Sequence, residues 1–559
     1  DIAGGRELEE GFIEAVCDRA DGVPLFAEEI VRAAFETGGG AAPTHTPAPG
    51  ALRDILLARL DRLGPAKVVA QHAACIGRRF DRTLLAAALT NYALPLDGAL
   101  ARMIEDRIVF PHEVNGAENY VFRHALVRDA AYESLPRSSR VAAHKRIHLA
   151  LATRADPDPG VAARHAREAG LDAEAIRWLR AAGAVALAQF AHREARSRFE
   201  QALAILEASG EDLQGERLEL LGHIGLCQAH ALGYGHPETI ASLDAARRLA
   251  LRHPDSPHAI PVLWQTYSAR YTQADLEETR KIGEELLALS TWNDDYGPQA
   301  TAGWRFIAAA DMLAGRFREA EEALARAEAA LDAQPTVRSV STIGIDHRVA
   351  IRLHKARVAA CLGRTEEARR LLALNEKEVR AEGRTHSLIL SLTLSCVVNL
   401  TLRDFTETHR LASESLLLCE RSKTSMWWSY AAAYEALSSL LGRGEVDAIR
   451  RYEAARRELS ASGTRVSMTL CDSLFAEGLA ASGDITRAER AILSAVVATD
   501  AGQEPWCAPE VLRLDGEIGR ESCRLDSKAS ADRFQQAIAI ASEQNASLWL
   551  KRLSSSTDR

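Results

Sequence analysis

The stretch Phe317-Arg-Glu-Ala-Glu-Glu-Ala-Leu-Ala-Arg-Ala327 sets a small residue at Ala320, a large apolar residue at Leu324 and a second small residue at Ala327. Spacings of four and three place these side chains on one stripe of a helix. The pattern recurs between residues 195 and 537, clearly or weakly, at Ala195/Phe199/Ala202, Thr239/Leu243/Ala246, Thr279/Gly283/Leu286, Ala320/Leu324/Ala327, Ala368/Leu372/Asn375, Thr408/Ala412/Ser415, Ala448/Tyr452/Ala455, Ala488/Ile492/Ala495 and Ser530/Phe534/Ala537. Successive stripes lie about 40 residues apart, a period typical of stacked helix pairs. The sequence therefore predicts an α-solenoid.

Turn residues support this interpretation. Gly315, Gly363 and Gly483 each stand shortly before a stripe, where a glycine can end the preceding helix in a left-handed cap. The rhythm resembles that of tetratricopeptide repeats, although their unit is nearer 34 residues. The longer spacing here predicts longer helices or turns. Solenoids of this kind usually bind a peptide, a protein or another ligand on a concave surface, so binding is favoured over catalysis.

The rest of the chain divides by composition. Residues 1–36 contain two helical runs, and residues 37–50 form a linker dominated by Gly and Pro. Residues 51–152 begin with several amphipathic helices. Around the turn pair Asn115-Gly116 the pattern of apolar residues then changes from the helical period to the alternating period of strands, which predicts a β-hairpin. Helices followed by one small hairpin are the plan of a winged helix. The expected fold is mainly all-α: the end of an upstream domain, a winged helix, and a solenoid over residues 153–559.

The composition narrows the function classes. A net charge of −9 gives no electrostatic reason to expect nucleic acid or an anionic membrane as the main partner. The nine cysteines occur without a close Cys-x-x-Cys pair and are interpreted as small buried apolar residues in a reducing compartment. No apolar run approaches the roughly 20 residues that span a bilayer. We expect a cytoplasmic protein that makes no membrane contact. Because the chain begins at Asp1, we also expect an upstream portion.

Four segments of the N-terminal third resemble a known family: Asp21-Gly-Val-Pro-Leu-Phe-Ala-Glu-Glu-Ile30, Leu52-Arg-Asp-Ile-Leu-Leu-Ala-Arg-Leu-Asp-Arg-Leu63, Ala74-Cys-Ile-Gly-Arg-Arg-Phe80 and Tyr120-Val-Phe-Arg-His-Ala-Leu-Val-Arg-Asp-Ala-Ala-Tyr-Glu-Ser-Leu135. They resemble the region after the nucleotide-binding core in bacterial signalling ATPases of the STAND and AAA type, especially those joined to class III adenylate or guanylate cyclase domains. Pro505-Trp-Cys-Ala-Pro-Glu-Val-Leu-Arg-Leu-Asp-Gly-Glu517 is similar to the last repeats of that family.

This resemblance implies a role for Gly22 and Pro24, because related ATPases hold the bound nucleotide against a Gly-x-Pro element. Pro24 would contact adenine, and residues 1–36 would be the lid helices that end the ATPase domain. The alternative is that Asp21-Gly-Val-Pro24 is simply a turn between two helices. No Gly-x-x-x-x-Gly-Lys-Ser/Thr motif occurs, so nothing in this sequence cradles phosphates. We expect no cofactor in this chain, and ATP or ADP with Mg²⁺ in a longer parent protein.

Two other candidate sites are weaker. The expected reading helix of the winged helix, residues 96–107, carries two Arg against two Asp and one Glu, so it lacks the basic face that DNA binding requires. His144 and His148 lie one helical turn apart, as in a zinc site, but no third ligand is evident nearby. We interpret residues 140–148 as a solvated basic helix face. No catalytic or metal-binding residue is predicted.

Three functions fit these observations. The first is the regulatory and sensor portion of a cyclase-associated signalling ATPase, in which the solenoid holds a protein, a peptide or a small inducer and switches its own upstream ATPase domain. The second is the C-terminal part of a STAND-type transcription activator. The third is a stand-alone tetratricopeptide-like adaptor. Whether a full-length parent is an enzyme stays open.

Overall fold

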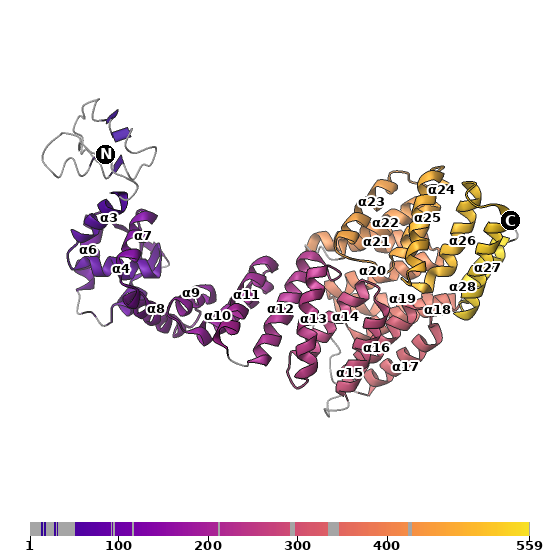
Figure 1. Cartoon of the computed structure of the whole chain (residues 1–559), viewed down its shortest axis with the longest axis horizontal. Coiled ribbons are helices and arrows are strands. Elements are labelled where there is room, and N and C mark those ends of the chain that lie inside the picture. The colour runs from indigo at the N-terminus through magenta and orange to yellow at the C-terminus, as the bar shows by residue number, and fades with distance from the viewer. Residues whose placement is uncertain are drawn as a thin grey trace. The chain divides into compact units, whose positions relative to one another are not determined.

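The chain forms an almost entirely helical structure in a computed structural model (Figure 1). The structure describes residues 13, 14, 16, 17, 27, 28 and 31, and residues 51–557 except 91, 93–94, 115–116, 211–212, 291–296, 334–345 and 423–426. It divides into two compact units. The N-terminal unit comprises Asp1–Val185 with Ala204–Gly210, and the C-terminal unit comprises Ala186–Leu203 with Glu211–Arg559.

The N-terminal unit combines helices with a small antiparallel sheet. Its described helices are α3 (Ala51–Asp61), α4 (Ala66–Ile76), α5 (Arg82–Ala88), α6 (Leu96–Glu105), α7 (Ala125–Ser134), α8 (Arg137–Ala152) and α9 (Pro159–Glu168), with most of α10 (Asp172–Ala188). Its strands are β1 (Arg79–Asp81), β2 (Val109–Val114) and β3 (Ala117–Phe122), in the order β1-β3-β2. The core lies around α4, whose Val69, Ala70 and Ala73 are inaccessible to solvent.

The predicted hairpin is confirmed, and one strand was missed. Strands β2 and β3 pair with Val109 opposite Phe122 and Val114 opposite Ala117. Strand β1 adds Phe80 opposite Tyr120. A strand of three residues is too short to show alternation of apolar and polar side chains, so β1 leaves no pattern in the sequence. Asp81 ends this strand and caps α5, because its carboxylate accepts a hydrogen bond from the Leu84 amide at 2.7 Å.

The interpretation of residues 140–148 as a solvated basic face was wrong for its histidines. The side chains of His144 and His148 are buried, with 3% and 2% of their surface exposed. Helix α8 packs on α4, α5 and α9, so the stripe with His144, Ile147 and His148 faces the core. His144 Nδ1 lies 2.8 Å from Nδ1 of His165, and burial lowers the pKa of these two rings to about 4 and about 3. A neutral pair of this kind stabilises the core.

Charged side chains that follow the hairpin form ion pairs. Arg123 and His124 lie 3.4 and 3.7 Å from the carboxylate of Glu28. Arg128 pairs with its neighbour Asp129 at 2.7 Å. The first two contacts join the residues that follow β3 to Glu28, within the N-terminal unit.

The C-terminal unit is a run of antiparallel helices. After α10 and α11 (His192–Ser209), which cross the boundary between the units, its described helices are α12 (Gln214–Leu232), α13 (Pro237–Arg252), α14 (Ala259–Thr272), α15 (Leu276–Ser290), α16 (Gly297–Leu313), α17 (Phe317–Asp332), α18 (His347–Cys361), α19 (Thr365–Glu382), α20 (Thr385–Leu402), α21 (Phe405–Ser422), α22 (Trp428–Arg443), α23 (Ala448–Ala461), α24 (Met468–Ala481), α25 (Ile485–Asp500), η1 (Pro505–Cys507), α26 (Ala508–Glu521), α27 (Ser527–Glu543) and α28 (Ser547–Thr557).

The solenoid prediction is confirmed in detail. Each small, large, small triplet lies on an odd-numbered helix from α11 to α27, including the weak triplets on α13, α15 and α21. The three residues of a triplet are buried in every case. The glycines at 315, 363 and 483 have φ angles of 78°, 81° and 87°, as their predicted role in left-handed turns requires. Each triplet therefore forms the buried face with which the second helix of a pair packs on its neighbours.

The even-numbered helices α12 to α26 form an inner layer, because each packs on the next one as well as on its odd-numbered partners. Helix α20 is long and apolar enough to cross a membrane by length and composition, but 72% of its residues are buried inside the protein. Its position between α18, α19, α21 and α22 makes it a core helix. Of the nine free cysteines, seven are buried as predicted, whereas Cys17 and Cys523 are exposed.

Candidate functional site

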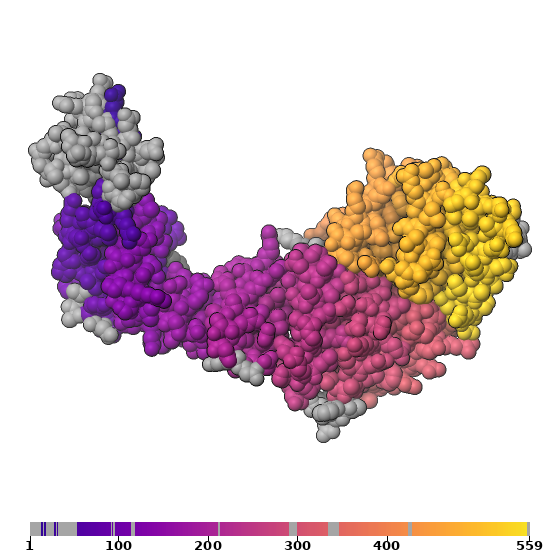
Figure 2. Space-filling view, in the orientation of Figure 1, coloured from indigo at the N-terminus to yellow at the C-terminus, as the bar shows by residue number. Residues whose placement is uncertain are grey.

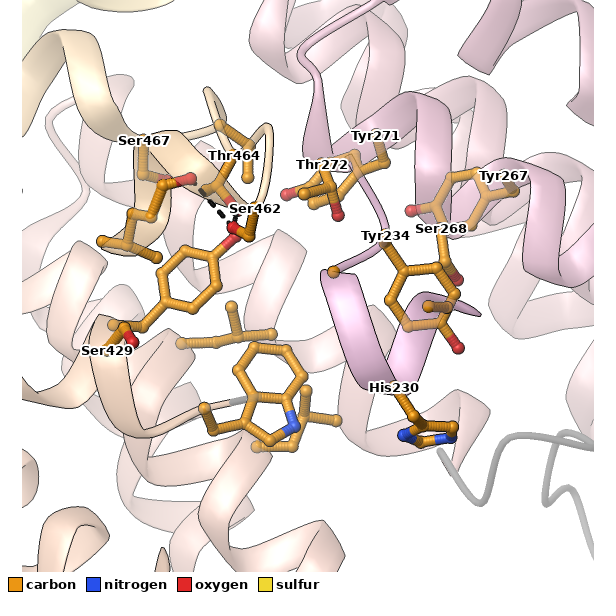
Figure 3. Close-up of a pocket in the computed structure, with 18 of the residues that line it drawn as sticks. His230, Tyr234, Tyr267, Ser268, Tyr271, Thr272, Ser429, Ser462, Thr464 and Ser467 are labelled. Atoms are coloured by element: carbon orange, nitrogen blue, oxygen red, sulfur yellow. Dashed lines mark hydrogen bonds between the residues drawn. The ribbon is translucent and has the colours of Figure 1, made fainter. Parts of the chain in front are cut away.

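A cavity of about 460 Å³ lies on the inner layer of the C-terminal unit (Figure 3). Its walls come from α12, α14, α16, α18, α20, α22 and α23, and from the turns that follow α12 and α23. Ligand pockets in proteins typically measure about 300–1,000 Å³, so the cavity suits a small molecule.

Aromatic rings and hydroxyl groups dominate the lining. The aromatic side chains are Tyr234, Tyr267, Tyr271, Trp427, Tyr430 and Tyr434. The hydroxyl side chains are Ser268, Thr272, Ser429, Ser462, Thr464 and Ser467. Figure 3 shows these groups facing one another from two sides, with Tyr234, Tyr267 and Tyr271 opposite Ser462, Thr464 and Ser467. Such a lining offers flat apolar surface together with hydrogen-bonding groups that orient a ligand.

Helical spacing explains how the tyrosines reach the cavity. Tyr267 and Tyr271 lie one turn apart on α14, and Tyr430 and Tyr434 lie one turn apart on α22. Each pair therefore faces the same side, with ring centroids 5.6 and 6.3 Å apart. Burial raises the pKa of Tyr234 to about 12, so its hydroxyl stays protonated at neutral pH.

Arg305 supplies a positive charge to the cavity wall. Its side chain is 4% exposed, and its guanidinium lies 4.8 Å from the ring centre of Trp264, 5.3 Å from that of Tyr267 and 4.8 Å from that of Phe306. Burial lowers the pKa of Arg305, but an arginine stays charged at neutral pH. Its Nε and Nη2 atoms are buried without a hydrogen-bond partner among the described residues.

The cavity histidines are neutral at pH 7. Burial lowers the pKa of His230 to about 4 and that of His354 to about 3, and the nearby charge of Arg305 contributes to the second shift. His386 is shifted in the same direction by burial. Among the described lining residues, Glu458 is the carboxylate, and it accepts a hydrogen bond from the Ser429 hydroxyl at 2.7 Å.

Two distant turns meet beside the cavity. The amides of Arg465 and Val466 both donate to the Thr272 carbonyl, at 2.9 and 3.0 Å. The Gln273 side chain donates to the Gly235 carbonyl at 3.1 Å. Gly235 also touches Gly463 so closely that a methyl group on either residue would overlap the backbone of the other. In Figure 2 the orange segment of the C-terminal unit correspondingly lies against the magenta segment.

A buried carboxylate holds one of these turns in place. Glu504 is inaccessible to solvent and accepts hydrogen bonds from the amides of Ser467 and Thr469, at 2.6 and 3.1 Å. The indole of Trp506 donates to it at 3.2 Å. Glu504 thus caps the start of α24 from a distant part of the chain. Burial raises the pKa of Glu504, while the charge of Arg357 opposes that shift.

The sequence-predicted contact residues Gly22 and Pro24 lie outside the described residues, so their role in binding adenine stays a prediction. Within the described chain, no group of three or more His, Cys, Asp or Glu side chains is arranged to hold a metal ion. The repeat pattern predicts a binding surface on the solenoid but does not identify the residues that line it. One signal was overlooked: Arg305 stands between the large aromatic residues Trp304 and Phe306, which suggests a buried position for this arginine.

Comparison with known proteins adds distant relatives. No family model matches the chain. A curated protein of Rhizobium meliloti (strain 1021), described as uncharacterized, is 26% identical over 462 residues, which are 76% of this chain and 44% of that protein. The chain thus spans less than half the length of this relative.

Two solved structures are similar at 11% sequence identity. One is a Signal Transduction ATPase with Numerous Domains with a tetratricopeptide repeat sensor, from Pyrococcus horikoshii; the match covers 98% of this chain and 74% of that one, with a TM-score of 0.35. The other is a Rap protein complexed with competence and sporulation factor; the match covers 66% of this chain and 99% of that one, with a TM-score of 0.45.

Proposed function

We propose that the helical repeats are a sensor that holds a small inducer in the cavity between α14 and α22. The observation that carries this proposal is the cavity of about 460 Å³ itself, walled by tyrosines and hydroxyl groups. Side chains that only filled a core would not leave about 460 Å³ of space between them.

Closure of the cavity provides a way to transmit the signal. The ligand would contact α14 on one side and the 462–467 turn on the other, and these two segments are joined by the Thr272 and Gly235 contacts. A ligand that touches both walls binds more tightly when the contacts at the Thr272 and Gly235 carbonyls are formed. Its binding therefore shifts the repeats toward the arrangement in which the cavity is closed.

We further propose that this sensor belongs to a signalling ATPase, associated with a cyclase domain in a longer parent. The resemblance of residues 18–30 and 120–135 to that family supports this assignment, with Gly22 and Pro24 at the nucleotide and ATP or ADP with Mg²⁺ in the upstream domain. Residues 51–152 would then be a winged helix with a packing role between the ATPase domain and the solenoid. The order of α3, α4, β1, α5, α6 and the β2–β3 hairpin supports that fold.

A DNA-binding role for this module has little support. On α6, Arg102 is engaged by Glu105 at 3.1 Å and by Asp106 at 3.0 Å. Arg82 is likewise paired, with Asp97 at 2.6 Å. These pairs leave little positive charge for phosphate contact. The transcription activator and the stand-alone adaptor remain the alternatives, and the cytoplasm is the proposed location in each case.

A variant that fills the cavity tests the proposal that the inducer binds there. Ser268→Trp places an indole in the space, whereas Ser542→Trp places one on an exposed face; both serines bond the carbonyl four residues earlier, at 3.0 and 2.8 Å. We expect ligands found by thermal-shift screening of the full chain to stabilise the wild type and Ser542→Trp but not Ser268→Trp. Equal stabilisation of all three proteins would place the ligand elsewhere.

A further inference from the structure

We infer that the cavity takes a neutral, flat molecule that carries hydroxyl groups, with its rings against Tyr271 and Trp427 and its edge at Tyr234. This inference rests on the proposed sensor function and specifies the class of its ligand. The open ring surface, the serine hydroxyl groups and the charges of the cavity wall each point to this class.

The ring surface that a ligand can reach comes from two separate helices. Tyr271, on α14, and Trp427, directly before α22, are half-buried and line the cavity, and each is backed by a buried tyrosine. The ring centroids of Tyr271 and Tyr267 lie 5.6 Å apart, and those of Trp427 and Tyr430 lie 5.7 Å apart. Because the inner rings support the outer ones, the outer rings offer fixed apolar faces. Such faces favour a ligand that is itself flat and ring-containing.

The serines of the lining can accept hydrogen bonds from a ligand but have already used their own protons. Ser268 and Ser462 donate to backbone carbonyls earlier in the chain, at 3.0 and 2.8 Å. Ser429 donates to the Glu458 carboxylate at 2.7 Å. A hydroxyl that donates its one proton keeps only acceptor capacity. The ligand must therefore bring the donors, which hydroxyl groups supply and a carboxylate does not.

Tyr234 links the ligand to the contact between the two turns. A methyl group on Gly233 would overlap Ser462, and one on Gly235 would overlap the backbone of Gly463. These close approaches hold the chain on both sides of Tyr234, whose ring lies in the cavity wall (Figure 3). Because its raised pKa keeps the Tyr234 hydroxyl protonated at neutral pH, this group can donate to a ligand hydroxyl or accept from it.

The charges of the wall favour a neutral ligand. Among the described residues that line the cavity, Arg305 and Glu458 are the two charged ones, and their charges are opposite. The guanidinium of Arg305 lies against aromatic rings with its Nε and Nη2 atoms buried, whereas Glu458 is exposed and accepts from Ser429. The histidines of the wall are neutral at pH 7. A ligand of either charge would thus be buried without an accessible partner of opposite charge, which costs free energy.

Calorimetry on the 559-residue chain at pH 7 tests this assignment. Four probes share two linked rings and differ in their polar groups: 4,4′-dihydroxybiphenyl donates, 4,4′-bipyridine only accepts, biphenyl-4-carboxylate is an anion and biphenyl-4-ylmethylammonium is a cation. Cellobiose offers many hydroxyl groups without a flat ring. We expect 4,4′-dihydroxybiphenyl to bind at one site per chain, and each of the others to bind about tenfold more weakly or worse.

A variant connects the binding to Tyr234. Tyr234→Phe keeps the ring and removes the hydroxyl, so it should weaken the binding of 4,4′-dihydroxybiphenyl by about fivefold. Tyr92→Phe, at an exposed tyrosine of the N-terminal unit, is the matched control and should bind as the wild type does. The inference is overturned if 4,4′-dihydroxybiphenyl does not bind, if the bipyridine or a charged probe binds as tightly, or if Tyr234→Phe keeps the full affinity.

The Ser268→Trp and Ser542→Trp pair separates the two proposals. If a charged probe, cellobiose or a tripeptide binds more tightly than 4,4′-dihydroxybiphenyl and Ser268→Trp abolishes that binding, the sensor cavity stands and the neutral ligand class falls. If bound 4,4′-dihydroxybiphenyl survives Ser268→Trp, the cavity is not its site and both proposals fail.

Discussion

Gly235 and Gly463 touch backbone to backbone, although one follows α12 and the other follows α23. Gly463 has a φ angle of 75°, a conformation that side chains rarely adopt, and an added methyl group would meet the Gly235 carbonyl. This contact joins the two walls of the cavity.

Gly463→Ala should therefore weaken ligand binding as well as stability. We expect a loss of about 2–4 kcal/mol in the free energy of unfolding, from left-handed strain and overlap together. Gly444→Ala is the matched control, since Gly444 has a φ of 67° but open space around its Cα. The control should lose only about 1 kcal/mol and keep its ligand affinity. Urea unfolding measures the free energy of unfolding, and calorimetry measures the ligand affinity. Equal ligand affinities in the two variants would contradict a role for the contact between Gly235 and Gly463 in binding.

Arg305→Met and Arg513→Met should differ in the stability of the ligand-free protein. Met fills a similar volume without charge, and the buried Nε and Nη2 atoms of Arg305 lack hydrogen-bond partners among the described residues, so this replacement is expected to be neutral or stabilising. Arg513→Met removes a partner of the buried Glu510 and should destabilise by about 3 kcal/mol. Chemical unfolding of both variants checks this, and a large loss on Arg305→Met would show that Arg305 stabilises the fold.

Glu510 should make the stability of the C-terminal unit depend on acid. Although burial alone would raise the pKa of Glu510, the charges of Arg513, Arg552 and Arg403 lower it overall to about 2. A folded pKa below the unfolded value of 4.5 means that the stabilisation is fully present above about pH 4.5 and is lost as the pH falls through 2. The full effect is about 3 kcal/mol.

Glu510→Gln isolates this effect, because the amide keeps the shape and does not titrate. We expect the difference in unfolding free energy between wild type and variant to shrink by about 1 kcal/mol from pH 7 to pH 4, and further at pH 3. Urea titrations at the three pH values measure it. A difference that stays constant with pH would show that the carboxylate is not preferentially charged in the folded state.

ATP should not bind this chain saturably, because the sequence lacks the motif that cradles phosphates. Calorimetric titration of ATP with Mg²⁺ into the 559-residue chain is expected to give only heats of dilution. ADP is titrated in the same way as a second nucleotide. Micromolar affinity for either would show a nucleotide site within these residues.

Local pattern was enough for the repeats and for the hairpin. Triplets such as Ala448/Tyr452/Ala455 lie within one helix, so their burial follows from spacing alone, and even the weak Thr279/Gly283/Leu286 triplet packs as predicted. The same logic failed for His144 and His148. Their face of α8 is buried by α4, α5 and α9, and composition within one helix does not reveal its neighbours.

The sequence by itself determined the helices, their pairing in repeats and the left-handed glycine turns, because each depends on residues within about 40 positions of one another. Only the tertiary structure decided that α14 and α22 enclose a cavity, that Gly235 meets Gly463, and that Arg305 is buried among aromatic rings. Those features depend on how successive repeats curve in space. That curvature sums many small packing angles, which no single stretch of the sequence encodes.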